Sequence, residues 1–102
     1  MKLIDEYLDY LSGIKRYSPR TIQIYKDVLE EFCGYIENED LLQSLNSQIL
    51  RSFEVFLMEK KHLGKRTVVM HLSALSSFAK YLVKQRLLES NPVKNIIRPK
   101  TD

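Results

Sequence analysis

Apolar residues recur along the chain at intervals of three and four, which is the spacing of one face of an α-helix. In the first segment they fall at Ile4, Tyr7, Leu8 and Leu11. Strand-like alternation does not persist anywhere, and the few Gly and Pro residues lie at the ends of periodic segments. The pattern predicts an all-α protein with four main helices, over about residues 2–13, 18–37, 46–62 and 65–86.

Capping residues support these boundaries. Ser18 can accept a hydrogen bond from a free backbone N–H at a helix start, and Pro19 suits the first helical position. Asn46 is the expected cap of the third helix, and Gly13 ends the first. The remaining breaks are the polar stretch 38–40, a Ser90-Asn91-Pro92 cap for a short helical piece at 93–97, and a polar tail at 98–102.

The buried stripe of each later helix follows from the same periodicity. Every stripe consists of aliphatic or aromatic residues on one side of its helix. The expected core residues are Ile22, Tyr25, Leu29, Phe32 and Ile36 in the second helix, Ile49, Phe53, Phe56 and Leu57 in the third, and Val68, Leu72, Leu75, Ala79 and Leu82 in the fourth.

Length and composition limit the rest. A chain of 102 residues is enough for one domain, which we place at residues 1–97, with 98–102 starting a linker. No apolar run approaches the ~18–20 residues of a membrane span, and the acidic start is unlike a secretory signal. One cysteine and two histidines exclude a disulfide framework and an ordinary structural zinc site. We therefore expect a cytoplasmic protein without metal or cofactor, and Cys33 as a packing residue.

The charge is divided unevenly along the chain. Residues 1–59 carry six Lys or Arg and eleven acids, whereas residues 60–102 carry ten Lys or Arg and two acids. A smaller basic cluster around residues 15–26 interrupts the acidic half. Basic segments of this kind attract polyanions, although a solvated helix face that happens to be basic would give the same pattern.

Mostly polar residues line up on the side of the fourth predicted helix that lies opposite its apolar stripe. They recur at spacings of three and four: Arg66, Ser73, Ser77, Lys80 and Lys84, with the apolar Met70 among them. Serine can donate to a phosphate without holding the helix away, while Lys and Arg supply charge. Lys65 and Thr67 join Arg66 at the helix start, where free N–H groups also favour anions. Lys80 and Lys84 could instead be merely solvated, and Thr67 an ordinary first-turn residue.

The start of the second helix repeats this composition. Ser18, Arg20 and Thr21 share its first turn, and Lys15 and Arg16 come just before it. We expect the two cationic helix starts to lie side by side, so that a duplex could rest across both. Ser18 could equally be only a helix cap, and capping is compatible with a phosphate contact.

Two blocks of sequence resemble the core-binding domain of tyrosine recombinases, the family of phage integrases and Xer-type enzymes. The first is Tyr17-Ser18-Pro19-Arg20-Thr21 with Tyr25 and Phe32. The second is longer and runs to the end of the chain: Lys65-Arg66-Thr67-Val68, Leu72-Ser73-Ala74-Leu75, Phe78, Tyr81-Leu82, Leu87, Asn91-Pro92 and Arg98-Pro99-Lys100. The match spans essentially the whole chain, with the blocks in order.

The resemblance implies a four- to five-helix, SAM-like orthogonal bundle. It further implies that the domain forms one jaw of a clamp on double-stranded DNA at a recombination site, with the second and fourth helices near the major groove. Other recombinase protomers would be partners in a synaptic complex, and the isolated domain is expected to be monomeric. A separate C-terminal domain of the family cleaves DNA with a tyrosine nucleophile. We find no such constellation here, so we expect a non-enzymatic fragment and structural roles for the six tyrosines.

The chain also departs from the family pattern. Positions that are often basic in the family are Met70, His71 and Ser76 here, which leaves fewer cations on the fourth helix. The step from Val68 and Leu75 places His71 beside the apolar stripe, where we expect it to be partly buried. Two other functions remain open: a helical protein–protein module that uses exposed Val69 and Met70, and a stand-alone DNA-binding regulator.

Overall fold

The computed structural model describes residues 2–96, and the elements in this range are helical. They are α1 (Lys2–Gly13), α2 (Pro19–Ile36), α3 (Leu41–Ser44), α4 (Ser47–Glu59), α5 (Lys65–Lys84) and the 3₁₀ turn η1 (Pro92–Asn95). The all-α prediction is confirmed. The tail at 98–102 and Ile97 lie outside the described residues, so the expected linker stays a prediction.

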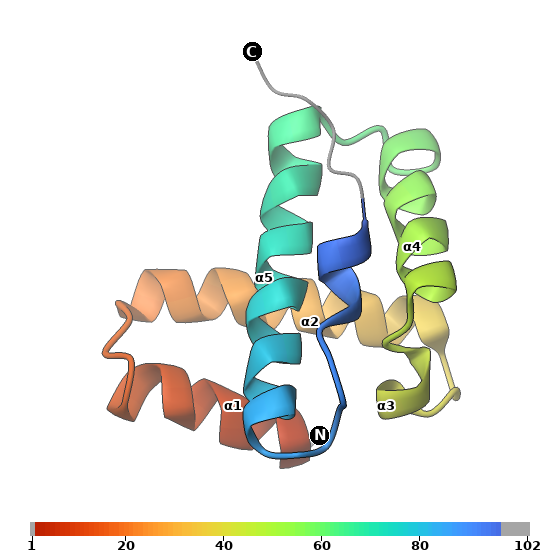
Figure 1. Cartoon of the computed structure of the whole chain (residues 1–102). Coiled ribbons are helices and arrows are strands. Elements are labelled where there is room, and N and C mark those ends of the chain that lie inside the picture. The colour runs from red at the N-terminus through yellow and green to blue at the C-terminus, as the bar shows by residue number, and fades with distance from the viewer. Residues whose placement is uncertain (1, 97–102) are drawn as a thin grey trace.

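The helices cross at steep angles in two pairs (Figure 1). α1 and α2 run antiparallel to each other, and α4 and α5 run antiparallel across them. η1 packs between α4 and α5, and it contacts both. This arrangement is the orthogonal bundle expected from the resemblance.

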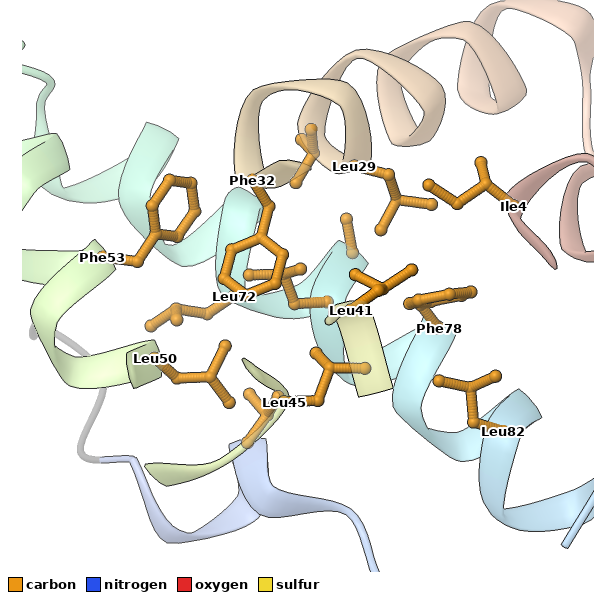
Figure 2. Packing of buried hydrophobic residues seen from close by; sticks show 14 of the residues in the cluster. Ile4, Leu29, Phe32, Leu41, Leu45, Leu50, Phe53, Leu72, Phe78 and Leu82 are labelled. Atoms are coloured by element: carbon orange, nitrogen blue, oxygen red, sulfur yellow. The ribbon is translucent and has the colours of Figure 1, made fainter. Parts of the chain in front are cut away.

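α5 is the central helix because its apolar residues reach around more than one side. The predicted stripe of Val68, Leu72, Leu75 and Leu82 is fully buried. Ala74, Phe78 and Tyr81 are buried as well, which the stripe alone did not predict. Figure 2 shows Leu72 and Phe78 close to side chains from the surrounding elements.

Aromatic rings hold the helix pairs together. Phe32 of α2 meets Phe53 of α4 edge-on, with ring centroids 5.1 Å apart. Tyr7 of α1 meets Phe78 and Tyr81 of α5 at 5.0 and 5.3 Å. Such contacts add about 0.5–1.5 kcal/mol each beyond the area that they bury. These ring contacts attach α1 to α5 and α4 to α2.

The predicted caps are confirmed at three helix starts. Ser18 Oγ accepts from the Thr21 N–H at 3.2 Å, and Asn46 Oδ1 accepts from the Ile49 N–H at 2.9 Å. Asn91 caps η1 through the Val93 N–H at 2.9 Å. α5 differs, since its cap is Gly64 and no side chain bonds its first N–H groups.

Three details of the elements differ from the sequence-based predictions. The short helix α3, capped by Asp40, lies in a stretch that the pattern left without structure. α5 ends at Lys84 rather than 86, because Arg86 adopts a left-handed backbone with φ 61°. The last piece is a 3₁₀ turn beginning at Pro92, rather than a helix beginning at Val93.

Candidate nucleic-acid interface

The basic residues predicted on α5 lie on exposed parts of the helix. Lys65, Arg66 and Thr67 are exposed on its first turn, and Lys80 and Lys84 are exposed on its last turns. Ser73 and Ser77 between them are half-buried. α5 carries four Lys or Arg residues and no Asp or Glu, so the helix itself has a net positive charge.

A hollow of about 480 Å³ opens between α5 and the segment that joins α1 to α2. It brings together five of the residues that the sequence singled out, from two parts of the chain. Its lining consists of Lys15, Ser73, Ser77, Lys80 and Lys84, with Ser76, Tyr10, Tyr17 and Tyr81. Three cations therefore surround a floor of hydroxyl groups and aromatic rings.

Ser77 is not as free as its place in the polar row implied. Its Oγ lies 2.6 Å from the Tyr7 hydroxyl, because α1 packs against this side of α5. Burial raises the pKa of Tyr7 well above its ordinary range, so Tyr7 stays neutral, and either hydroxyl can donate in this bond. Ser77 also lines the hollow, and a hydroxyl can take part in more than one hydrogen bond.

The rim of the hollow is ordered by ring contacts. The Lys84 ammonium lies 5.5 Å from the centroid of the Tyr10 ring, within range of a cation–π contact. The Tyr10 ring in turn lies 5.0 Å from Tyr81. The sequence placed these tyrosines in the core and rim of the bundle, which is confirmed, but it did not show that they border the cations.

The start of α2 carries its cations on exposed side chains. Lys15, Arg16 and Arg20 are exposed, and Arg16 adopts a left-handed backbone with φ 56°. Ser18 donates to Thr21 Oγ1 at 3.0 Å besides accepting from its N–H. The capping role of Ser18 is therefore confirmed, while a phosphate contact from Ser18 or Thr21 stays a prediction.

The expectation that the two helix starts lie side by side is wrong. α2 and α5 are joined by a 2.9 Å hydrogen bond between Glu31 and His71. At 1.5 Å per residue, the start of α2 lies about 18 Å along its helix from that point, and the start of α5 about 9 Å along the other. Figure 1 shows the two starts at different edges of the bundle. The fold instead brings Lys15 to the same hollow as Lys80 and Lys84.

Two further expectations concern Val69, Met70 and His71, which follow the first turn of α5. Val69 and Met70 are half-buried, and Met70 packs against the core, so they expose less apolar surface than the protein–protein alternative assumed. His71 is only 6% exposed, which confirms burial. Periodicity indicated the burial of His71, but not the Glu31 partner forty residues away.

We also searched the described residues for a metal site, a membrane-spanning helix and a reactive thiol. Across residues 2–96, no three His, Cys, Asp or Glu side chains are grouped so that they could hold a metal ion. Within the same range, none of the helices combines the length and apolar character needed to cross a membrane. Burial raises the pKa of the Cys33 thiol, which disfavours the reactive thiolate.

Comparison with known proteins agrees with the resemblance. Residues 4–86 match the family described as "Phage integrase, N-terminal SAM-like domain". The chain belongs to this family. No solved structure gives a significant match.

The curated relatives include proteins named tyrosine recombinase XerC. That of Psychromonas ingrahamii is 39% identical over 98% of this chain and 34% of its own length. Those of Escherichia coli O157:H7 and Bacillus subtilis are 35% and 33% identical, over 96% and 94% of this chain and 33% and 32% of their own lengths. This SAM-like chain therefore spans about a third of the length of the relatives that it matches.

Proposed function

We propose that this SAM-like domain binds duplex DNA as the N-terminal part of a tyrosine recombinase. Its family and the names of its relatives supply the class of protein. In this role the domain is one jaw of a clamp on the recombination site, it meets other protomers during synapsis, and it performs no chemistry itself. Strand cleavage belongs to the remaining two-thirds of a relative's length.

The observation that carries this proposal is the group of three lysines around one hollow. Lys15 comes from the α1–α2 segment and Lys80 and Lys84 come from α5, so the fold converges cations from distant positions. A phosphodiester strand can lie along such a border, with the lysines neutralising phosphates and Ser73 and Ser77 close to the backbone.

The other predicted residues extend this surface in two directions. One direction leads along α5 to its first turn, which carries Lys65, Arg66 and Thr67. Lys65 and Lys84 are nineteen residues apart, so the helix between them is about 28 Å long, close to the ~34 Å of one duplex turn. Arg16, Ser18, Arg20 and Thr21 follow Lys15 along the chain, at the start of α2. Because the helix starts are far apart, these residues hold separate phosphates along the DNA, rather than one shared grip.

Salt dependence tests the proposal directly. If about five phosphates are neutralised, log K for a duplex should fall with log salt at a slope of roughly −4 to −5. The measurement is fluorescence anisotropy of a labelled duplex titrated with the protein over a series of salt concentrations. Affinity that does not change with salt would contradict the proposal.

Paired variants then locate the surface. Lys80→Ala with Lys84→Ala should reduce the salt slope by about 2 and weaken binding similarly on unrelated duplex sequences, because the contacts are to phosphates. The matched control is Lys60→Ala with Lys94→Ala, which removes two exposed lysines from the end of α4 and from η1. Equal losses from both pairs would place the DNA elsewhere.

A protein–protein role has one observation in its favour. Val55 and Met58 are three residues apart on the outer side of α4 and are 50% and 37% exposed. They could form part of a contact with a second protein. Sedimentation of the domain with and without DNA separates the two roles, since a contact through these residues would be insensitive to salt.

A further inference from the structure

A cluster of ionisable side chains around the buried His71 joins α5 to α2 and to the segment after α4. His71 Nδ1 lies 2.8 Å from the carbonyl oxygen of Thr67, one turn earlier in α5. His71 Nε2 lies 2.9 Å from Glu31 Oε1 on α2. The other carboxylate oxygen of Glu31 accepts from Lys61 Nζ. One imidazole ring therefore bridges two helices.

Both ring nitrogens of His71 face groups that accept hydrogen bonds. A backbone carbonyl cannot donate, so the Nδ1 contact requires a proton on Nδ1. A neutral ring with that proton would turn the lone pair of Nε2 toward a carboxylate oxygen, which is repulsive. With Glu31 ionised, the two bonds exist together only when the ring carries both protons.

The surroundings favour an ionised Glu31 opposite this ring. Burial alone would raise the pKa of Glu31, but its hydrogen bonds to Lys61 and His71 outweigh the burial and hold the pKa below its usual value. The groups facing His71 are the Glu31 carboxylate from α2, with Lys61 behind it, and the Phe53 ring of α4, whose centroid is 6.4 Å away. Glu31 is the negative partner that a buried cation requires.

We propose that His71 acts as a doubly protonated latch that ties the first turn of α5 to α2, and that loss of one proton releases it. Thr67 ends the latch on α5, in the same turn as Lys65 and Arg66. The latch therefore controls how firmly that cationic turn is held. This inference concerns the free protein and does not depend on DNA binding.

The direction of the pH effect follows from the two partners. Only the cationic form of His71 completes the bridge to Thr67 and Glu31. The stabilisation from this bridge is therefore present at lower pH and is lost as His71 deprotonates with rising pH. The Glu31 carboxylate must stay ionised, and its lowered pKa keeps it so until the pH falls below the usual range of Glu. The latch is closed between these limits.

Nitrogen-15 NMR of the His71 ring in the intact chain tests the proposal. Both ring nitrogens should carry protons at every pH at which the Val68–His71 amides are protected from hydrogen exchange. A ring with one unprotonated nitrogen while that protection is unchanged would overturn the proposal.

Glu31→Gln provides the decisive variant because it preserves shape. The new amide can donate to Nε2, so a neutral ring then satisfies both contacts. We expect a singly protonated His71 in this variant, and protection of the Val68–His71 amides from hydrogen exchange that no longer changes with pH. In the unmodified chain the same protection should fall about tenfold as His71 deprotonates.

Glu30→Gln is the matched control, since Glu30 is the exposed neighbour on α2. It should behave like the unmodified chain in both measurements. A His71 ring that stays doubly protonated in Glu31→Gln would show that Glu31 does not hold the charge, and it would refute the latch.

Discussion

Single side chains at the α1–α5 contact combine packing with one polar bond. Tyr7 is fully buried, yet its hydroxyl meets Ser77 at the border of the hollow. Periodicity predicted that Tyr7 would be buried, since it depends only on spacing along α1. The partner of its hydroxyl is seventy residues away, and nothing in the spacing of either helix specifies it.

Replacing Tyr7 by Phe should keep the ring contacts with Phe78 and Tyr81 and lose only the hydroxyl bond. We expect the free energy of unfolding to fall by about 0.5–1.5 kcal/mol. Because burial raises the pKa of Tyr7, the unfolded chain releases this proton first, so folded stability should decline above about pH 10. Urea unfolding at neutral and alkaline pH measures both effects. Tyr7→Phe should reduce the alkaline decline, and an unchanged decline would contradict this explanation.

At the scale of the elements, local signals predicted most boundaries. Ser18, Asn46 and Asn91 cap their helices as expected, because a cap depends on a few neighbouring residues. The four-residue helix α3 was missed because it is too short to show a period. Arg86 ends α5 through a left-handed conformation, which a non-glycine residue does not signal in advance.

Two substitutions of Ser18 should separate its cap from its place on the cationic surface. Ser18→Ala removes the acceptor for the Thr21 N–H and should lower the free energy of unfolding by about 1 kcal/mol. Ser18→Asp keeps an acceptor and should preserve stability, but its negative charge should weaken binding to a duplex. Thermal unfolding and anisotropy measure the two effects. Equal DNA affinity of Ser18→Asp and the unmodified chain would place Ser18 away from the DNA.

For the whole molecule, the resemblance predicted the orthogonal bundle, whereas charge patterning named candidate residues without predicting which of them the fold brings together. Lys15, Lys80 and Lys84 do converge, but the starts of α2 and α5 do not. The reason is the crossing of α2 and α5 near Glu31 and His71, a tertiary contact that no local pattern encodes.

Backbone amide shifts on addition of a duplex should map this surface over the whole domain. We expect the largest changes at 15–21, 65–67 and 73–84, with α4 nearly unaffected because it packs on the other side of α5. Titration of a uniformly labelled domain with a duplex and with a matched polyanion such as heparin gives the comparison. Changes concentrated on α4 would point to the protein–protein role instead.

The tyrosines of the hollow have a spectroscopic consequence. The chain has six tyrosines and no tryptophan, so its ultraviolet emission comes from phenol rings alone. Tyr10, Tyr17 and Tyr81 line the hollow, and half of these fluorophores therefore sit where an arriving phosphate or base would alter their lifetime. Unlabelled protein thus carries its own optical sensor of whether the hollow is occupied.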